Sequence, residues 1–147
     1  METTNKHDEF RVTLRFYGDD LDPDEMTRLL GCAPTNAERT GEIVTTSRGT
    51  TRTVRRGNWR LGAETSEAEI EDQVVELLAR LTDDLAVWQA LTARFEADVF
   101  CGVFPAKEMH GFELSPWVLG LLADRNLTIG FDIYSPSLAG DDEQAET

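Results

Sequence analysis

The residues best suited to hold an anion are arginines crowded into one short segment of the chain. Residues 39–60 contain six arginines and a single acid, so the segment has a formal charge of +5. The whole chain carries −14, which leaves −19 outside the segment. A guanidinium pairs with carboxylates and phosphates through two parallel hydrogen bonds, so this segment is suited to an anionic ligand or an acidic partner. The arginines are Arg39, Arg48, Arg52, Arg55, Arg56 and Arg60, and the acid is Glu42.

Groups that carry covalent or metal chemistry are few. The chain has two histidines, His7 and His110, and two cysteines, Cys32 and Cys101, at no spacing typical of metal ligands or of a nucleophile with its base. The acidic stretch 19–25 lacks the alternating oxygen ligands and the glycine of a calcium loop. We therefore predict no catalytic residue, no metal site and no cofactor, and the sequence favours a protein that is not an enzyme. A polar loop at residues 107–111 is interpreted as a surface turn.

Two predicted strands place further polar groups on a solvated face. Residues 10–17 alternate strictly between apolar and polar, as does the final predicted strand, 127–134, with Leu127, Ile129, Phe131 and Ile133 inward. If the two strands are neighbours, their polar residues form one binding platform that holds two tyrosines. Cross-strand ion pairs on a solvated sheet produce the same pattern, so both interpretations stay open. The platform residues are Arg11, Arg15, Tyr17, Asp132 and Tyr134.

The arginine segment itself is predicted to form a hairpin. Two β-branched arms, 43–46 and 50–54, flank a turn at Ser47-Arg48-Gly49, and the chain returns to the core at residues 57–61. Candidate binding residues here are Arg52, Arg55, Arg56 and Arg60. The alternative is that these arginines pair with the protein's own 28 acids.

Start and stop signals predict helices between the strands. Asp22 and Pro23 open a short helix that Gly31 ends, and Ser115 and Pro116 open another near the C-terminus. A capping box at 66–69 predicts a helix to Leu81, with a second helix or a bend at 82–84. Residues 95–104 are predicted as a buried strand, and 32–40 as an irregular loop.

This order predicts an α+β fold. We expect a two-layer sandwich in which a mixed or mostly antiparallel sheet carries helices on one face, as a ferredoxin-like variant with an added helix and strand. The expected domain covers residues 9–135, between an N-terminal tail, 1–8, and a disordered acidic tail, 136–147.

Short motifs resemble the bacterial domain-of-unknown-function family 4279. They are the polar-out first strand, 21–25 with 29–31, Pro34-Thr35, Gly41, Trp59-Arg60-Leu61 and Phe131-Asp132-Ile133-Tyr134. The resemblance implies a small bacterial protein without recognised catalytic residues, and it implies no site.

The leading hypothesis is a non-enzymatic binding module with a protein partner, of the immunity or regulatory type. One alternative is a sensor or enzyme for a small anion, with a pocket between sheet and helices, where Arg15 or Arg60 clamps the ligand beside Tyr17 or Tyr134. Another is nucleic-acid binding through the hairpin, which the net charge of −14 opposes. No membrane span or export leader is indicated, so we expect a soluble cytoplasmic protein.

Overall fold

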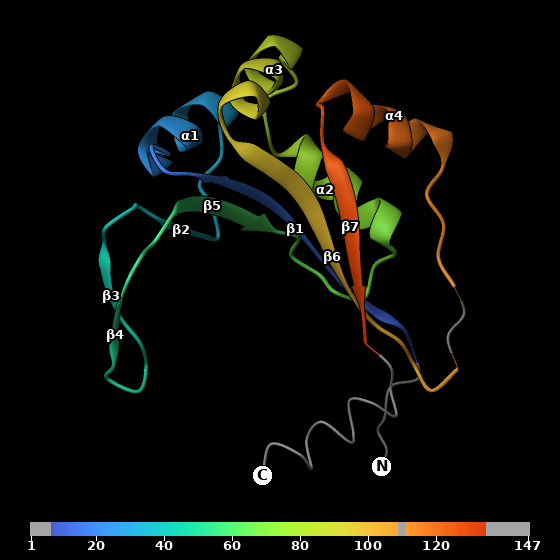
Figure 1. Cartoon of the computed structure of the whole chain (residues 1–147). Coiled ribbons are helices and arrows are strands. Elements are labelled where there is room, and N and C mark those ends of the chain that lie inside the picture. The colour runs from blue at the N-terminus through green and yellow to red at the C-terminus, as the bar shows by residue number, and fades with distance from the viewer. Residues whose placement is uncertain (1–6, 109–110, 135–147) are drawn as a thin grey trace.

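A five-stranded mixed sheet forms one layer of the molecule. The computed structural model describes residues 7–108 and 111–134. The strands of the sheet lie in the order β2 (Asn36–Glu38), β5 (Gly57–Gly62), β1 (Glu9–Gly18), β6 (Glu96–Phe104) and β7 (Thr128–Ile133). Neighbours are antiparallel except β6 and β7, which are parallel. A separate hairpin of β3 (Ile43–Thr45) and β4 (Thr51–Thr53) extends from the β2–β5 edge, away from the helices (Figure 1).

The helices form the second layer, on one face of the sheet (Figure 1). They are α1 (Pro23–Leu30), α2 (Ile70–Ala79), α3 (Leu85–Arg94) and α4 (Pro116–Asp124). The arrangement is ferredoxin-like. It combines this strand order with the element sequence β1, α1, β2, β5, α2 with α3, and β6. The α3 helix is extra within it, the hairpin is inserted between β2 and β5, and α4 and β7 are appended. The predicted α+β fold with helices on one face is confirmed.

Capping residues begin α1, α3 and α4 where the sequence predicts. The Asp22 carboxylate accepts from the Asp24 backbone N–H at 3.0 Å, and Gly31 ends α1 with a φ of 83°. Ser115 caps α4 through its hydroxyl. Asp84 caps α3, so the segment after α2 is a second helix rather than a bend in the first.

Two local predictions are wrong. The predicted loop 32–40 contains β2, a three-residue edge strand whose place is fixed by pairing with β5. The predicted capping box at 66–69 does not form, because α2 begins at Ile70 and Glu69 makes no side-chain capping bond. The Ser66 hydroxyl donates instead to the Glu9 carboxylate at 2.8 Å, which joins this segment to β1.

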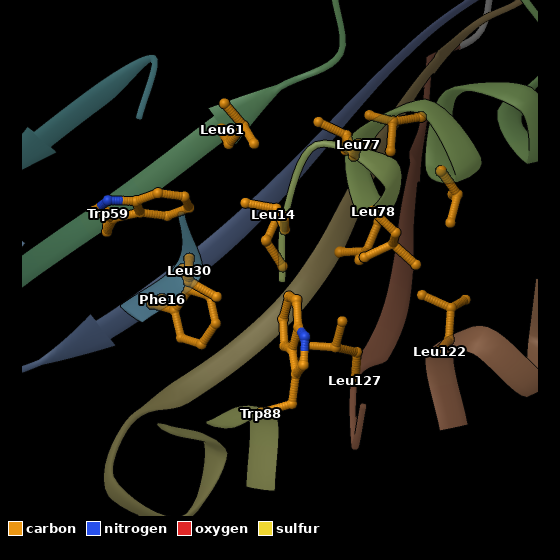
Figure 2. Close-up of a cluster of buried hydrophobic side chains, with 14 of the residues drawn as sticks. Leu14, Phe16, Leu30, Trp59, Leu61, Leu77, Leu78, Trp88, Leu122 and Leu127 are labelled. Atoms are coloured by element: carbon orange, nitrogen blue, oxygen red, sulfur yellow. The ribbon is translucent and has the colours of Figure 1, made fainter. Parts of the chain in front are cut away.

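The core fills the space between the two layers. The inward residues Leu14 and Phe16 of β1 have no solvent exposure, and neither does Trp59 of β5 (Figure 2). Phe16 meets Trp59 edge to face, and Trp88 of α3 lies on its other side, with ring centroids 6.1 Å away in both cases. The interior between sheet and helices is thus occupied by apolar side chains.

The edge strand β7 is less covered than its pattern predicts. Leu127, just before it, is buried, but Phe131 is 38% and Ile133 58% exposed. The described strands begin at Glu9 and end at Ile133. The predicted tails lie outside the described residues except for His7 and Asp8, and the Asp8 carboxylate accepts from the Ala106 backbone N–H at 2.8 Å.

Candidate functional site

The sheet face turned away from the helices carries the polar residues of every strand, and we call it the open face. At its centre the register sets Arg15 of β1 between Arg60 of β5 and Asp98 of β6. The next row places Tyr17 between Asn58 and Glu96. Strand alternation thus brings four predicted site residues, Arg11, Arg15, Tyr17 and Arg60, onto one surface.

The charge of Arg15 is already matched. Its Nε and Nη2 donate to the two carboxylate oxygens of Asp98 at 2.8 and 2.7 Å, which raises the pKa of Arg15. The guanidinium also lies 4.5 Å from the centroid of the Phe100 ring. With Tyr17 and Thr128 it borders a shallow cavity of about 290 Å³. This pairing leaves Arg15 a weak clamp for a second anion.

The predicted platform is assembled differently from the expectation, because β1 and β7 are not neighbours. β6 lies between them, and Gly102 separates Arg11 from Asp132 in register. The Phe104 ring covers this glycine, since a Cβ there would lie 3.2 Å from the ring. Arg11 lies over the same ring at 5.4 Å, and Tyr134 stacks on it at 4.7 Å between centroids. Phe104 therefore links the two groups of predicted residues.

Asp132 and Tyr134 form a pair of their own at the edge of the open face. The Tyr134 hydroxyl donates to the Asp132 carboxylate at 2.7 Å, and this bond raises the pKa of Tyr134.

The hairpin, residues 43–53, is hereafter called the arm, and an ion pair ties it to the sheet. Arg52 Nη2 lies 2.5 Å from a carboxylate oxygen of Glu38 in β2. The other oxygen of Glu38 accepts from Asn58 Nδ2 at 3.0 Å. Glu38 is only 8% exposed, and its pKa is lowered by the bond from Asn58 and then by Arg52. Arg52 thus anchors the arm.

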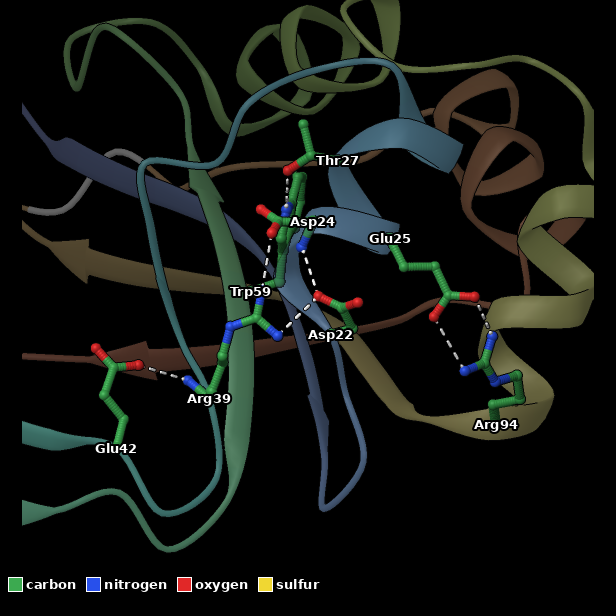
Figure 3. Close-up of polar contacts among 8 residues, drawn as sticks. All are labelled: Asp22, Asp24, Glu25, Thr27, Arg39, Glu42, Trp59 and Arg94. Atoms are coloured by element: carbon green, nitrogen blue, oxygen red, sulfur yellow. Dashed lines mark hydrogen bonds and ion pairs between the residues drawn. The ribbon is translucent and has the colours of Figure 1, made fainter.

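Other arginines of the segment also pair with the protein's own acids. Arg56 Nη1 lies 3.0 Å from Glu96, and the pairing raises the pKa of Arg56. Arg39 contacts Asp22 at 2.9 Å and Asp24 at 2.8 Å (Figure 3). The backbone bond from Asp24, followed by Arg39, lowers the pKa of Asp22.

The acidic stretch 19–25 is engaged in such pairs too. Glu25 pairs with Arg94 through two bonds of 3.1 Å, which lower the pKa of Glu25 (Figure 3). For Arg39, Arg52 and Arg56 the structure therefore fits the alternative of internal pairing.

Three arginines of residues 39–60 have no internal ion pair among the described residues and can bind an anion. The guanidinium groups of Arg48, Arg55 and Arg60 make no ion pair with any residue in the described ranges. Arg48 and Arg55 are exposed on and just after the arm, and Ile43 of the arm is 70% exposed. Arg60 lies on the open face with a buried Nε that has no partner in the described part of the chain. The candidate site is the open face around Arg60 together with the arm.

Several residues of the candidate site could not be identified from the sequence alone. Glu38 and Asn58 stand in short polar stretches, and only the pairing of β2 with β5 brings them under Arg52. Phe100 and Phe104 stand out as outward aromatics of a strand with apolar residues on both faces, which is the signal that could have found them.

Both cysteines are free, and burial raises the pKa of Cys101 to about 12. The loop at 107–111 lies partly outside the described residues, including His110.

Within the described ranges no group of three or more His, Cys, Asp or Glu residues is placed to hold a metal ion. No helix there has the length and apolarity that a bilayer crossing requires.

The strand order, the single helical layer and the open face define an α+β protein of ferredoxin-like topology with an inserted arm. The family model described as domain of unknown function DUF4279 matches residues 8–136, so the chain belongs to this family. The resemblance seen in the sequence is thereby confirmed. A comparison with curated proteins finds no match, and a comparison with solved structures finds none either.

Proposed function

We propose that this protein is a non-enzymatic binding module that takes an acidic protein segment between its arm and the open face of its sheet. The contact is of the kind that an immunity or regulatory protein makes. One observation carries the proposal: in a chain of net charge −14, Arg48, Arg55 and Arg60 make no ion pair with a carboxylate among the described residues, although three arginines of the same segment do. The charge of Arg60 contributes to lowering the pKa of Glu38 but forms no ion pair with it.

A carboxylate-bearing partner supplies what these arginines lack. Arginine and tyrosine are enriched in binding hot spots, and the open face offers Tyr17 beside the row of Arg60. The exposed Ile43 on the arm adds an apolar contact. The proposal includes a cytoplasmic location, which suits the free thiols of Cys32 and Cys101.

The test compares the unaltered tagged chain with a double variant, Arg48→Ser with Arg55→Ser, in pull-downs from the source cells at physiological salt. A matched control, Arg28→Ser with Lys107→Ser, removes the same charge from exposed positions away from the arm. We expect a specific protein to be retained by the wild type and the control. The arm variant should bind it at least about tenfold more weakly while its melting temperature stays unchanged.

Three outcomes would contradict the proposal. They are an arm variant that retains the same protein with unchanged affinity, a partner lost equally from the control, and retained material that disappears on nuclease treatment. The last outcome would favour nucleic-acid binding through the arm instead.

A further inference from the structure

The helical layer contains a charged side chain that is almost wholly buried. Arg125 follows α4 directly and is 7% exposed. Its Nη1 donates to the Leu121 carbonyl oxygen at 3.1 Å, and its Cζ lies 5.7 Å from the centroid of the Trp88 ring. Its Nε has no hydrogen-bond partner, and the guanidinium makes no ion pair with any residue of the described ranges.

Burying a guanidinium without a counterion is costly, because the charge loses its hydration and gains no full opposite charge in return. The carbonyl groups at the end of α4 and the face of Trp88 offset part of this cost, since both present partial negative charge. Neither replaces an anion. Arg125 is therefore short of one negative partner.

Arg125 also lines a pocket whose other lining residues come from α2, the segment 81–83 and α4. The helices α2 and α4 contact each other and lie on the same face of the sheet (Figure 1). The pocket has a volume of about 400 Å³, within the range of small-molecule sites. Most of its lining is aliphatic, with Thr82, Asp83 and Arg125 as the polar members. The aliphatic members are Val75, Leu78, Ala79, Leu81 and Leu121.

We propose that this pocket binds a small amphipathic carboxylate, with its head group on Arg125 and its hydrocarbon chain between α2 and α4. The carboxylate supplies the missing charge, and a guanidinium binds a carboxylate through two parallel hydrogen bonds. The hydrocarbon chain covers the aliphatic lining. This site lies on the opposite side of the sheet from the arm, so it goes beyond the proposed function, and its test does not involve the partner.

Asp83 is the competing counterion. It is exposed at the pocket, and it makes no ion pair with Arg125. If Asp83 served as the partner of Arg125, Asp83→Asn would lower the stability of the ligand-free chain, and that result would overturn the proposal. We expect Asp83→Asn to leave stability unchanged and to strengthen octanoate binding, since a like charge near the head group is removed.

Octanoate is the probe, titrated into the full chain by calorimetry, with 1-octanol and butyrate as comparison compounds. Octanol keeps the chain length without the charge, and butyrate keeps the charge with a shorter chain. We expect octanoate to bind at least about tenfold more tightly than either. Equal affinity for octanol, or no binding at millimolar octanoate, would overturn the proposal.

The matched variants are Arg125→Gln and Arg28→Gln, the latter at an exposed position of α1. Arg125→Gln should weaken octanoate binding at least about tenfold and leave octanol binding unchanged, while Arg28→Gln should change octanoate binding less than about twofold. Amide chemical shifts of the unaltered chain keep the test valid if Arg125→Gln does not fold. Octanoate should perturb Leu78, Leu81 and Leu121, and perturbations confined to other regions would refute the site.

Discussion

The side-chain amide of Gln73 takes the place of a neighbouring strand for the backbone of Val12. Its Oε1 accepts from the Val12 N–H at 3.3 Å, just where β5 ends its pairing with β1. Its Nε2 donates to the carbonyl oxygens of Phe10 and Ala68, both at 2.9 Å. Gln73 is 1% exposed, so these bonds form away from water. A polar residue in the middle of an apolar helix face thereby completes the sheet.

Gln73→Leu should therefore destabilise the protein. Leucine fills a similar volume but leaves a buried N–H and two carbonyl groups unpaired, which we expect to lower the free energy of unfolding by about 2–4 kcal/mol. Urea denaturation measures the change. Gln89→Leu, at an exposed position of α3, is the control and should shift the free energy by less than about 0.5 kcal/mol. Equal stability of the two variants would show that the Gln73 bonds contribute nothing net.

Among the arginines of residues 39–60, one with an internal ion pair should contribute to stability, and one without an ion pair should not. Arg52→Ser removes the charge beside the nearly buried Glu38, so we expect a loss of about 1–2 kcal/mol in the free energy of unfolding. Arg55 has no ion pair in the described part of the chain, and Arg55→Ser should be neutral within about 0.5 kcal/mol. Chemical denaturation of the two variants side by side tests this, and a reversed order of stabilities would contradict the assignment of Arg52 as the anchor of the arm.

The free energy of unfolding should decrease as the pH is lowered into the acid range. The pKa values of Glu38, Glu25 and Asp22 are lowered in the folded protein, from ordinary values of 4.5 for glutamate and 3.8 for aspartate. These carboxylates bind protons more readily in the unfolded chain, so their contribution to the free energy of unfolding is complete at pH values above their ordinary pKa values. The contribution is lost as the pH falls through the lower pKa values of the folded protein. Melting temperatures measured from pH 6 downwards should drop most steeply below about pH 4.5.

Glu38→Gln isolates one contribution to this dependence. The variant should be less stable at neutral pH and show a shallower acid dependence than the wild type, because the ionisable group has gone. Glu67→Gln, at an exposed position, should keep the wild-type profile. An unchanged acid profile in Glu38→Gln would exclude Glu38 as a contributor.

The local features of this fold were predictable because short-range physics sets them. The alternation of β1 and the caps at Asp22, Asp84 and Ser115 depend on neighbouring residues alone. β2 was missed because its three residues, 36–38, carry no apolar pattern and are a strand only through β5.

The candidate site was less predictable, because its geometry depends on long-range pairing. That Arg15 meets Asp98, and that Phe104 stands between Arg11 and Tyr134, follow from a strand order that no local pattern encodes. Arg125 gave no signal at all, since an arginine after a helix usually lies in water, and only packing against Trp88 shows its burial.

The position of β1 in the middle of the sheet has a consequence for the nascent chain. β1 leaves the ribosome before every other strand, yet its partner β6 begins only at Glu96, and the Arg15 and Asp98 pair joins residues 83 positions apart. The edge of β1 that pairs with β6 therefore stays unpaired until β6 has been synthesised. We expect the closing of so long a loop to slow folding and to leave the apolar stretch from Phe10 to Phe16 open to aggregation during that interval.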